Sequence, residues 1–322
     1  MLQTIIGIDV SKNTLDVVML HPGGTRHKVI DNGAHGYQQL QNWFKQQKVG
    51  SVHACLEATG QYGEGVAEFL YAQGHQVSVV NPTRIKRYGE SKLHRNKTDK
   101  ADAALIAEFC SKEKPALWAP QPAFRKHLRW LVRYLADLES IYQQERNRFL
   151  SGVRDEFVLN ALEAHMVYIR QQCNAVRQAI QQLIETTPVL KKQQDLLVSI
   201  TGIAELSAAR LIAELGDISA FENAPQLAAF TGLNPKGKSS GTSVYKRPHV
   251  SKEGRAFLRS ILYMPAIVAR RHNPIVRAFC DRLEERKLPK KAVTIAAMHK
   301  LIHIVYGVLK HQQPFDPNYL AS

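Results

Sequence analysis

The 322-residue sequence has only four cysteines, and they lie far apart with no CxxC pair among them. This spacing fits neither a zinc module nor the disulfide framework of a small secreted domain. We therefore expect Cys55, Cys110, Cys173 and Cys280 to be reduced residues of the protein core.

Long hydrophobic runs are also missing. No apolar run approaches the length of about 18 residues that indicates a membrane-spanning helix. The first residues lead directly into a strand-like stretch, without the basic and apolar regions of a signal peptide. We therefore expect no membrane span and a cytoplasmic bacterial protein, associated with the nucleoid when active.

Acidic residues are few relative to basic ones: 28 Asp and Glu stand against 43 Lys and Arg, which gives a formal net charge of +15. Such an excess favours polyanionic partners, because each phosphate that a Lys or Arg neutralises releases condensed counterions. Nucleic acid is the leading class of partner. A basic surface that is merely solvated is the alternative.

The length allows two or three domains at about 150 residues per domain, and we divide the chain into 1–114, 115–187 and 188–322. The first region combines three β-rich runs, separated by turn residues, with a later alternation of helices and strands. The expected strands are 4–10, 15–20, 25–30, 51–56 and 75–80, and the expected helices are 36–47, 63–73 and about 98–111. This order predicts a mixed α/β sheet.

The later regions read as helical. Prolines at 115, 120 and 122 mark a linker, after which apolar residues recur at three- and four-residue steps as far as Leu183. Long helices follow, either as an antiparallel or intermolecular coiled pair or as a plain bundle. From about 189 we expect several more helices, with a polar, basic, glycine-containing segment at 234–256 between them.

Four acidic residues suggest a metal site. Asp9 ends the first strand and Glu57 follows the strand 51–56, whereas Asp99 and Asp102 share one face at the start of a helix. In the order strand, strand, helix this is the acidic layout of the ribonuclease H and RuvC folds. Taken singly each has an ordinary alternative, such as a turn residue or a first-turn residue next to the Thr98 cap.

Carboxylates that gather in this way need a counter-charge. Two carboxylates about 4 Å apart repel by roughly 4 kcal/mol at an effective dielectric near 20. Divalent cations remove this repulsion, and a pair of Mg²⁺ (or Mn²⁺) ions can activate one phosphate oxygen and stabilise the departing one. The tetrad therefore predicts two metal ions per site.

A basic run precedes the Asp pair and could bring phosphate backbone to these metals, or it could be a solvated loop. The nucleic-acid contacts that we predict from it are Arg84, Lys86, Arg87, Lys92, Arg95 and Lys97.

Residues 199–220 resemble a helix-hairpin-helix centred on Gly202, whose turn amides would bind phosphate. Ala204 stands where a second glycine is usual, so packing is an equal alternative. A second cluster of cations follows at 236–259, with seven Lys or Arg and one acidic residue. We predict nucleic-acid contacts by Lys236, Lys238, Lys246, Arg247, Lys252, Arg255 and Arg259.

A serine in the Ser-Gly turn of this cluster could present its Oγ to a phosphodiester while the cations stabilise the developing charge. Free serine is a weak nucleophile and no histidine stands nearby as an obvious base. From residue types alone, a solvated loop is the favoured interpretation.

Several segments in a fixed order carry a family resemblance: GIDVSKNTLDV, CLEATG, RNKTDKADA, the Gly202 hairpin, FTGLNP, SSGTS, and SKEGRAFLR followed by YMPA. Together they resemble the DEDD transposases of the Piv and MooV type, the IS110 group of insertion-sequence recombinases, over nearly the whole chain.

The resemblance implies a RuvC-like domain, a coiled-coil segment and a helical transposase domain. It implies that Asp9, Glu57, Asp99 and Asp102 bind the metals and that Ser240 is the nucleophile of a covalent phosphoserine link. It also implies a homo-oligomer, a dimer or a tetramer on DNA, that joins donor and target DNA under the guidance of a structured bridge RNA encoded beside the gene.

Two other functions compete with the transposase. A RuvC-like junction nuclease would hydrolyse DNA with the carboxylates alone, so Ser240 would be dispensable. A non-catalytic nucleic-acid-binding protein would use the acidic residues structurally. Metal-dependent cleavage separates the second from the others, and a protein–DNA adduct separates the transposase from the nuclease.

Overall fold

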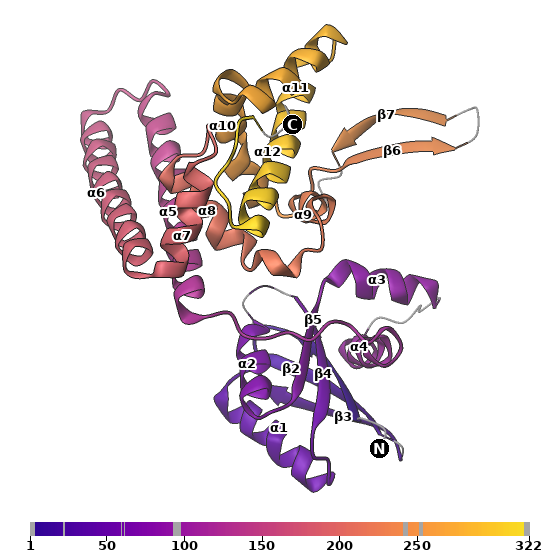
Figure 1. The fold of residues 1–322 in the computed structure, drawn as a ribbon. Coiled ribbons are helices and arrows are strands. Elements are labelled where there is room, and N and C mark those ends of the chain that lie inside the picture. The colour runs from indigo at the N-terminus through magenta and orange to yellow at the C-terminus, as the bar shows by residue number, and fades with distance from the viewer. Residues whose placement is uncertain are drawn as a thin grey trace. The chain divides into compact units, whose positions relative to one another are not determined.

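The computed structural model describes residues 4–318 apart from 22, 59, 61, 93–97, 241–243 and 251–253, and it describes only the backbone of 235–240 and 244–250. The chain divides into two compact units, Met1–Pro120 and Gln121–Ser322 (Figure 1). The division into three regions stays a prediction.

The first unit is built on a five-stranded sheet with the order β3-β2-β1-β4-β5. The strands β1 to β3 form an antiparallel meander, and β4 and β5 run parallel to β1. The strands are β1 Thr4–Val10, β2 Thr14–His21, β3 Gly24–Asp31, β4 Val52–Glu57 and β5 Gln76–Val80. This confirms the predicted mixed sheet and a ribonuclease-H-like α/β fold.

Helices cover both faces of the sheet (Figure 1). The helices are α1 Ala34–Gln46, α2 Glu64–Ala72, α3 Pro82–Ser91 and α4 Asp99–Glu113. On one face, the alternate residues Ile6 and Ile8 of β1 pack with buried residues of α1 and α2. On the other face, Cys55 of β4 packs with Ile85 of α3 and Ile106 of α4.

Residues 84–91 of the basic run lie on α3, a helix that was not predicted from the sequence, and the contacts of this run with phosphate stay a prediction. Asn81 caps this helix by accepting a hydrogen bond of 2.9 Å from the amide of Thr83, and Pro82 occupies the first turn. Asn-Pro is a helix-start signal, because proline lacks only an amide that the first turn leaves unpaired.

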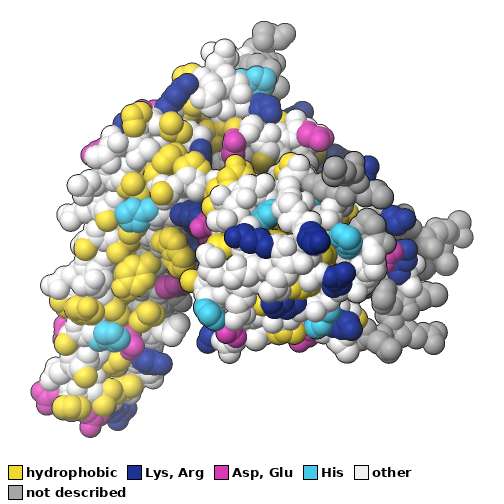
Figure 2. Space-filling view, turned by 90° about the horizontal axis from the view of Figure 1, so that it is seen from below, with side chains coloured by type: hydrophobic (Ala, Val, Ile, Leu, Met, Phe, Trp, Pro, Cys, Tyr) yellow, Lys and Arg dark blue, Asp and Glu magenta, His cyan; other side chains and the backbone are white. Residues whose placement is uncertain are grey.

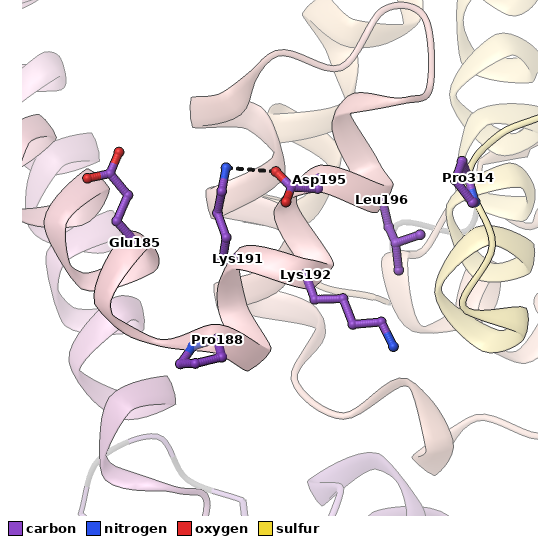
Figure 3. A pocket seen from close by; sticks show the side chains of 7 residues that line it. All are labelled: Glu185, Pro188, Lys191, Lys192, Asp195, Leu196 and Pro314. Carbon is purple, nitrogen blue, oxygen red and sulfur yellow. Dashed lines mark hydrogen bonds and ion pairs between the residues drawn. The ribbon is translucent and has the colours of Figure 1, made fainter.

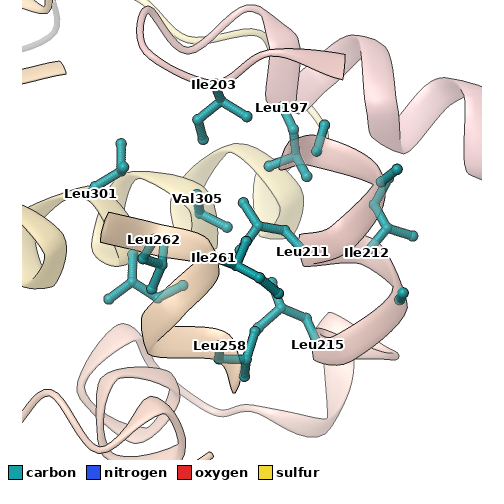
Figure 4. Packing of buried hydrophobic residues seen from close by; sticks show 14 of the residues in the cluster. Leu197, Ile203, Leu211, Ile212, Leu215, Leu258, Ile261, Leu262, Leu301 and Val305 are labelled. Atoms are coloured by element: carbon teal, nitrogen blue, oxygen red, sulfur yellow. The ribbon is translucent and has the colours of Figure 1, made fainter. Parts of the chain in front are cut away.

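The second unit is helical around one large apolar core. Its helices are α5 Ala123–Phe149, α6 Glu156–Thr186, α7 Pro188–Val198, α8 Glu205–Leu215, α9 Ala224–Thr231, α10 Ala256–His272, α11 Pro274–Glu285 and α12 Lys290–His311, with a short 3-10 helix at Ile218–Ala220. Figure 4 shows Leu211 and Leu215 of α8 packed with Leu258 and Ile261 of α10, and Val305 of α12 beside them.

The long helices α5 and α6 form an antiparallel pair within one chain. Glu139 of α5 binds Arg177 of α6 at 2.9 Å, and Glu145 binds His165 at 3.3 Å, so later residues of α5 meet earlier residues of α6. Of the arrangements left open by the sequence, the structure therefore has the antiparallel pair.

Among the described residues, α12 is the one helix long and apolar enough, by length and composition alone, to cross a membrane. Its apolar residues belong to the core of the second unit, where Leu301, Ile302 and Val305 are fully buried. Packing against neighbouring helices accounts for its hydrophobicity.

The expectation of an all-helical end of the chain is incomplete, because a two-stranded hairpin interrupts it. Strand β6, Pro235–Ser240, pairs antiparallel with β7, Val244–Val250, and Ser240 stands opposite Val244 (Figure 1). The segment is rich in Gly, Ser and Lys, which are poor predictors of a strand. The two strands therefore form because they pair with each other, and not because their residues favour strands.

Candidate active site

Asp9 and Glu57 lie at the ends of adjacent parallel strands. Ile8 of β1 is the register partner of Leu56 of β4, so the two carboxylates follow at the same level of the sheet. Side chains alternate between faces along a strand. Since Ile8 and Leu56 pack with α1 and α2, Asp9 and Glu57 project from the face that α4 covers.

Asp99 and Asp102 lie in the first turn of α4. Thr98 caps that helix by accepting a hydrogen bond of 3.2 Å from the amide of Ala101. Gly7 lets the helix approach closely, because a Cβ there would lie only 2.1 Å from the carbonyl oxygen of Ala103. The missing side chain thus brings the first turn of α4 to the end of β1.

The electrostatics of Asp9 indicate that Asp102, Asp99 and Asp16 lie near enough to act on it. Burial raises the pKa of Asp9 above its usual 3.8, and the charges of Asp102, Asp99 and Asp16 raise it further, in that order. A hydrogen bond from the amide of Val10 lowers it. The groups acting on Asp9 are thus mostly negative, and a divalent cation would fit this donor set of hard oxygen ligands. As placed, no three His, Cys, Asp or Glu side chains among the described residues are arranged to hold a metal ion.

A fifth carboxylate, Asp16, was missed by the sequence analysis. It is the direct cross-strand partner of Asp9, and its Oδ1 lies 2.7 Å from Nε2 of His27 on β3. The alternation along β2 could have revealed it, because Asp16 shares a face with Val18 and Leu20, which pack towards α4.

The predicted basic contacts on α3 lie beside α4. The guanidinium of Arg84 lies 5.5 Å from the ring centroid of Phe109, and Lys92 binds Glu108 at 2.8 Å. Lys86 is 76% exposed and lies 4.0 Å from Glu90. Arg87 also has an interaction partner. Arg95 and Lys97 lie outside the described residues.

The predicted contacts of the second unit fall into two groups. Lys236, Lys238, Lys246 and Arg247 lie on β6 and β7, beside the strand end that carries Ser240, and Lys252 lies outside the described residues. Arg255 and Arg259 instead have partners inside the chain. Arg255 donates to Glu214, and Arg259 donates to two backbone carbonyls.

The turn at Gly202 has a packing role. Its φ is +112°, and a Cβ would lie 2.8 Å from the Cβ of Ala269 on α10. The fully buried Asn273 donates to the carbonyl oxygen of Thr201 at 3.2 Å. Of the two interpretations of this turn, packing is thus the one with observed contacts.

A cavity of about 550 Å³ opens at the junction of α6 and α7. Figure 3 shows Lys191 and Asp195, joined by an ion pair of 2.7 Å, together with Leu196 and Pro314 at its wall. None of the predicted site residues lines it, so the candidate chemistry does not lie there.

The close approach at Gly7 makes a first prediction. Gly7→Ala should lower the free energy of unfolding by about 1–3 kcal/mol, because α4 must move away from β1 to admit the methyl group. Denaturant unfolding measures this change. The matched control is Gly50→Ala, where a Cβ meets no atom within 4 Å, and we expect a change within about 0.5 kcal/mol. Equal stabilities for the two variants would contradict the tight packing.

The raised pKa of Asp9 makes a second prediction. A carboxyl whose pKa is higher in the folded state favours folding when protonated, so this contribution is lost as pH rises from about 3.8 through the folded pKa. Without divalent metal, Asp9→Asn should therefore be more stable than wild type at pH 7, by on the order of 1 kcal/mol.

Metal should reverse that order. Mn²⁺ at 100 times its dissociation constant would stabilise wild type by about 2.7 kcal/mol and Asp9→Asn much less. Thermal unfolding with and without Mn²⁺ measures both. An equal response of the two proteins would remove Asp9 from the metal site.

A ribonuclease-H-like sheet with carboxylates at the strand ends and at the start of α4, in a chain with a large basic excess, fits an enzyme that acts on nucleic acid. Two family models match the chain: residues 6–158 match the DEDD transposase model of the IS110 type, and residues 194–281 match the model described as "Transposase IS116/IS110/IS902 family". The chain belongs to the IS110 family of transposases and is an enzyme that acts on DNA.

Relatives extend over the full length. The chain is 33% identical to the pilin gene-inverting protein of Moraxella bovis over 319 residues, which cover 98% of each protein. It is 24% identical to the transposase of insertion sequence element IS1111A of Coxiella burnetii, over 97% of this chain and 91% of that one. A solved structure of T. thermophilus RuvC with a Holliday junction substrate matches 36% of this chain and 98% of that chain, at 14% identity and a TM-score of 0.28. The family models and the two full-length relatives confirm the resemblance to the IS110 transposases.

Proposed function

We propose that this protein moves its insertion sequence by cleaving and rejoining donor and target DNA under the guidance of a structured RNA encoded beside its gene. The catalytic part is supported by Glu57, which follows in register beside Asp9 on adjacent parallel strands, and by the charges of Asp102 and Asp99, which act on Asp9. The RNA comes from the family resemblance alone.

The tetrad Asp9, Glu57, Asp99 and Asp102 would hold two Mg²⁺ or Mn²⁺ ions, with Asp16 beside them. Bound metal supplies charge stabilisation for a phosphate that is being attacked and for the oxygen that departs. The protein's own part would be to orient the carboxylates: β1 and β4 position Asp9 and Glu57 in register, and Gly7 allows the close approach of α4, which carries Asp99 and Asp102. His27 holds Asp16.

Ser240 supplies the nucleophile in this proposal. A bond forms between its Oγ and the phosphorus, and the phosphorus–oxygen bond to one DNA strand end breaks. The serine hydroxyl gives up its proton as it attacks, and the departing oxygen of the DNA strand takes up a proton. The reverse attack by a new strand end releases the serine, so energy is conserved in the phosphodiester. Because cations surround Ser240 in the sequence but no base stands near it, we propose that it works together with the carboxylates of the same or a neighbouring subunit.

Self-association is supported by apolar side chains exposed on the α5–α6 pair. Figure 2 shows hydrophobic side chains at the surface of the body on the left, where α5 and α6 lie in Figure 1. Those at least 40% exposed on these helices include Trp130, Tyr134, Ile141, Phe157, Val167 and Tyr168. A homo-oligomer that covers them would also bring donor and target DNA together.

The function is tested with purified protein, Mg²⁺, plasmids that carry the genomic DNA flanking the gene, and RNA transcribed from that flanking DNA. We expect joined products that require both protein and RNA. If the protein joined the DNA equally well without the RNA, the proposed guidance by RNA would be refuted. Nicked or hydrolysed DNA without joining would favour the alternative, a RuvC-like junction nuclease.

Binding should also depend strongly on salt. With about eight phosphate contacts from α3, the hairpin and their neighbours, the log–log slope of the association constant against salt would be near −7. Fluorescence anisotropy with labelled duplex DNA measures this slope. The salt concentration is varied between about 50 and 200 mM, the range over which proteins with many phosphate contacts lose most of their DNA affinity. A slope near −2 would mean that the basic excess is mostly solvated surface.

A further inference from the structure

The two ends of the β6–β7 hairpin meet at one place in the second unit, which we call the hairpin root: residues 230–234, residues 254–259 and Glu214. The amide of Arg255 donates to the carbonyl oxygen of Phe230 at 3.1 Å. A Cβ on Gly254 would lie 2.2 Å from the backbone nitrogen of Gly232, so the two ends touch backbone to backbone. Only glycine allows this approach.

Arg259 bridges the two ends. Its Nη1 donates to the carbonyl oxygen of Thr231, just before the hairpin, and to that of Gly254, just after it, both at 3.0 Å. Thr231 is fully buried at the end of α9. One guanidinium group from α10 therefore ties the entry and the exit of the hairpin to each other.

Arg255 fixes the root to the helical core. Its Nη1 donates to the carbonyl oxygen of Glu214 at 3.1 Å and lies 3.4 Å from Oε2 of the same residue. The Glu214 side chain is only 1% exposed, and Arg133 of α5 binds its Oε1 at 2.8 Å. The guanidinium of Arg255 also lies 4.6 Å from the ring centroid of Phe230. The root is thus held by α5, α8, α9 and α10.

Ser240 lies far enough from the hairpin root that a small rotation at the root would displace it considerably. Ser240 is the last residue of β6, five residues beyond Pro235, which places it roughly 17 Å from the root at about 3.3 Å per residue. A rotation of about 10° at the root would move Ser240 by roughly 3 Å over that length. Since a misplacement of about 1 Å can cost about 100-fold in rate, the angle of the hairpin must be tightly controlled.

We propose that Arg259 and Arg255 are positioning residues that hold the hairpin at the angle that Ser240 needs, and that they are not contacts to DNA phosphates. This inference rests on the proposed role of Ser240 as nucleophile. Both arginines were predicted from the sequence to contact nucleic acid. We instead give them a role within the protein, because their guanidinium groups already donate hydrogen bonds to buried groups of the chain.

Arg259→Lys tests the proposal because it keeps the positive charge. A lysine ammonium is a point charge on a different stem and cannot reproduce the guanidinium bridge. Full-length protein is incubated with flanking DNA, its transcript and Mg²⁺, and the denaturation-resistant protein–DNA adduct is followed under single-turnover conditions. We expect the rate at saturating DNA to fall about 10- to 100-fold, with the dissociation constant and the salt slope unchanged.

The matched control is Arg271→Lys, an exposed arginine of the same helix, which should behave as wild type. Glu214→Gln should lower the adduct rate without weakening DNA binding, which loss of a phosphate contact could not explain. Melting curves verify that each variant is folded, and Arg255→Lys provides a second substitution at the root.

Two results would overturn the proposal. One is a folded Arg259→Lys or Arg255→Lys that forms the adduct at the wild-type rate. The other is Arg259→Gln with weaker DNA binding, a salt slope reduced by about 1 and a normal rate at saturation, since that pattern marks a phosphate contact. Wild type that cleaves DNA without any adduct would instead refute the role of Ser240, and the inference with it.

Discussion

Ser240→Ala is expected to abolish the covalent protein–DNA adduct and to lower strand exchange by at least about a thousandfold, as removal of a catalytic nucleophile does elsewhere. DNA binding should stay intact, because the substitution removes one hydroxyl and no charge. Denaturing gel electrophoresis of labelled DNA, with and without protease treatment, measures the adduct.

Neighbouring serines provide the matched control for Ser240→Ala. Ser239 precedes it in β6 and is the register partner of Tyr245. Ser239→Ala and Ser243→Ala should keep the adduct. If Ser240→Ala cleaved DNA at the wild-type rate, the serine mechanism would be wrong and the junction nuclease would be the better account.

Asp102→Asn is expected to lower both cleavage and adduct formation on the order of a thousandfold, because it keeps the shape of the side chain but removes the charge that we propose binds metal. DNA affinity should be equal or higher, because the substitution removes one negative charge from the place where we propose that DNA phosphate binds. Quench-flow measurement of strand cleavage in Mg²⁺ or Mn²⁺ gives the rate.

The control for Asp102→Asn is Glu113→Gln, which removes an exposed carboxylate at the other end of α4. It should leave the rate unchanged. If Asp102→Asn formed the adduct at the normal rate, Ser240 would act without the carboxylates, and the proposed joint site would be refuted.

The first unit was largely predictable because its signals are local. Apolar alternation gives the strands, and the acidic residues interrupt that pattern at Asp9 and Glu57. The spacing of Asp99 and Asp102 places them on one helix face, as the structure shows for α4. The helix α3 was predictable in principle from Asn81-Pro82 but was obscured by its charges.

The features that could not be predicted from the sequence depend on contacts between residues that are far apart in the chain. Arg255 reads as one cation among seven, and its partner Glu214 lies 41 residues earlier on another helix. Asp16 can be recognised as part of the site only from its register with Asp9 and from its contact with His27 on the next strand. The hairpin likewise becomes recognisable only through pairing, because its Gly, Ser and Lys residues carry little strand propensity.

The central claim is that one DNA phosphate is attacked by Ser240 with the help of the carboxylate tetrad. The most direct measurement is the identification of the DNA-linked residue by mass spectrometry, after the adduct formed in Mg²⁺ is digested with nuclease and protease. We expect a nucleotide on Ser240 in wild type and none in Asp102→Asn. A nucleotide on another residue, or complete cleavage with no linked residue, would contradict it.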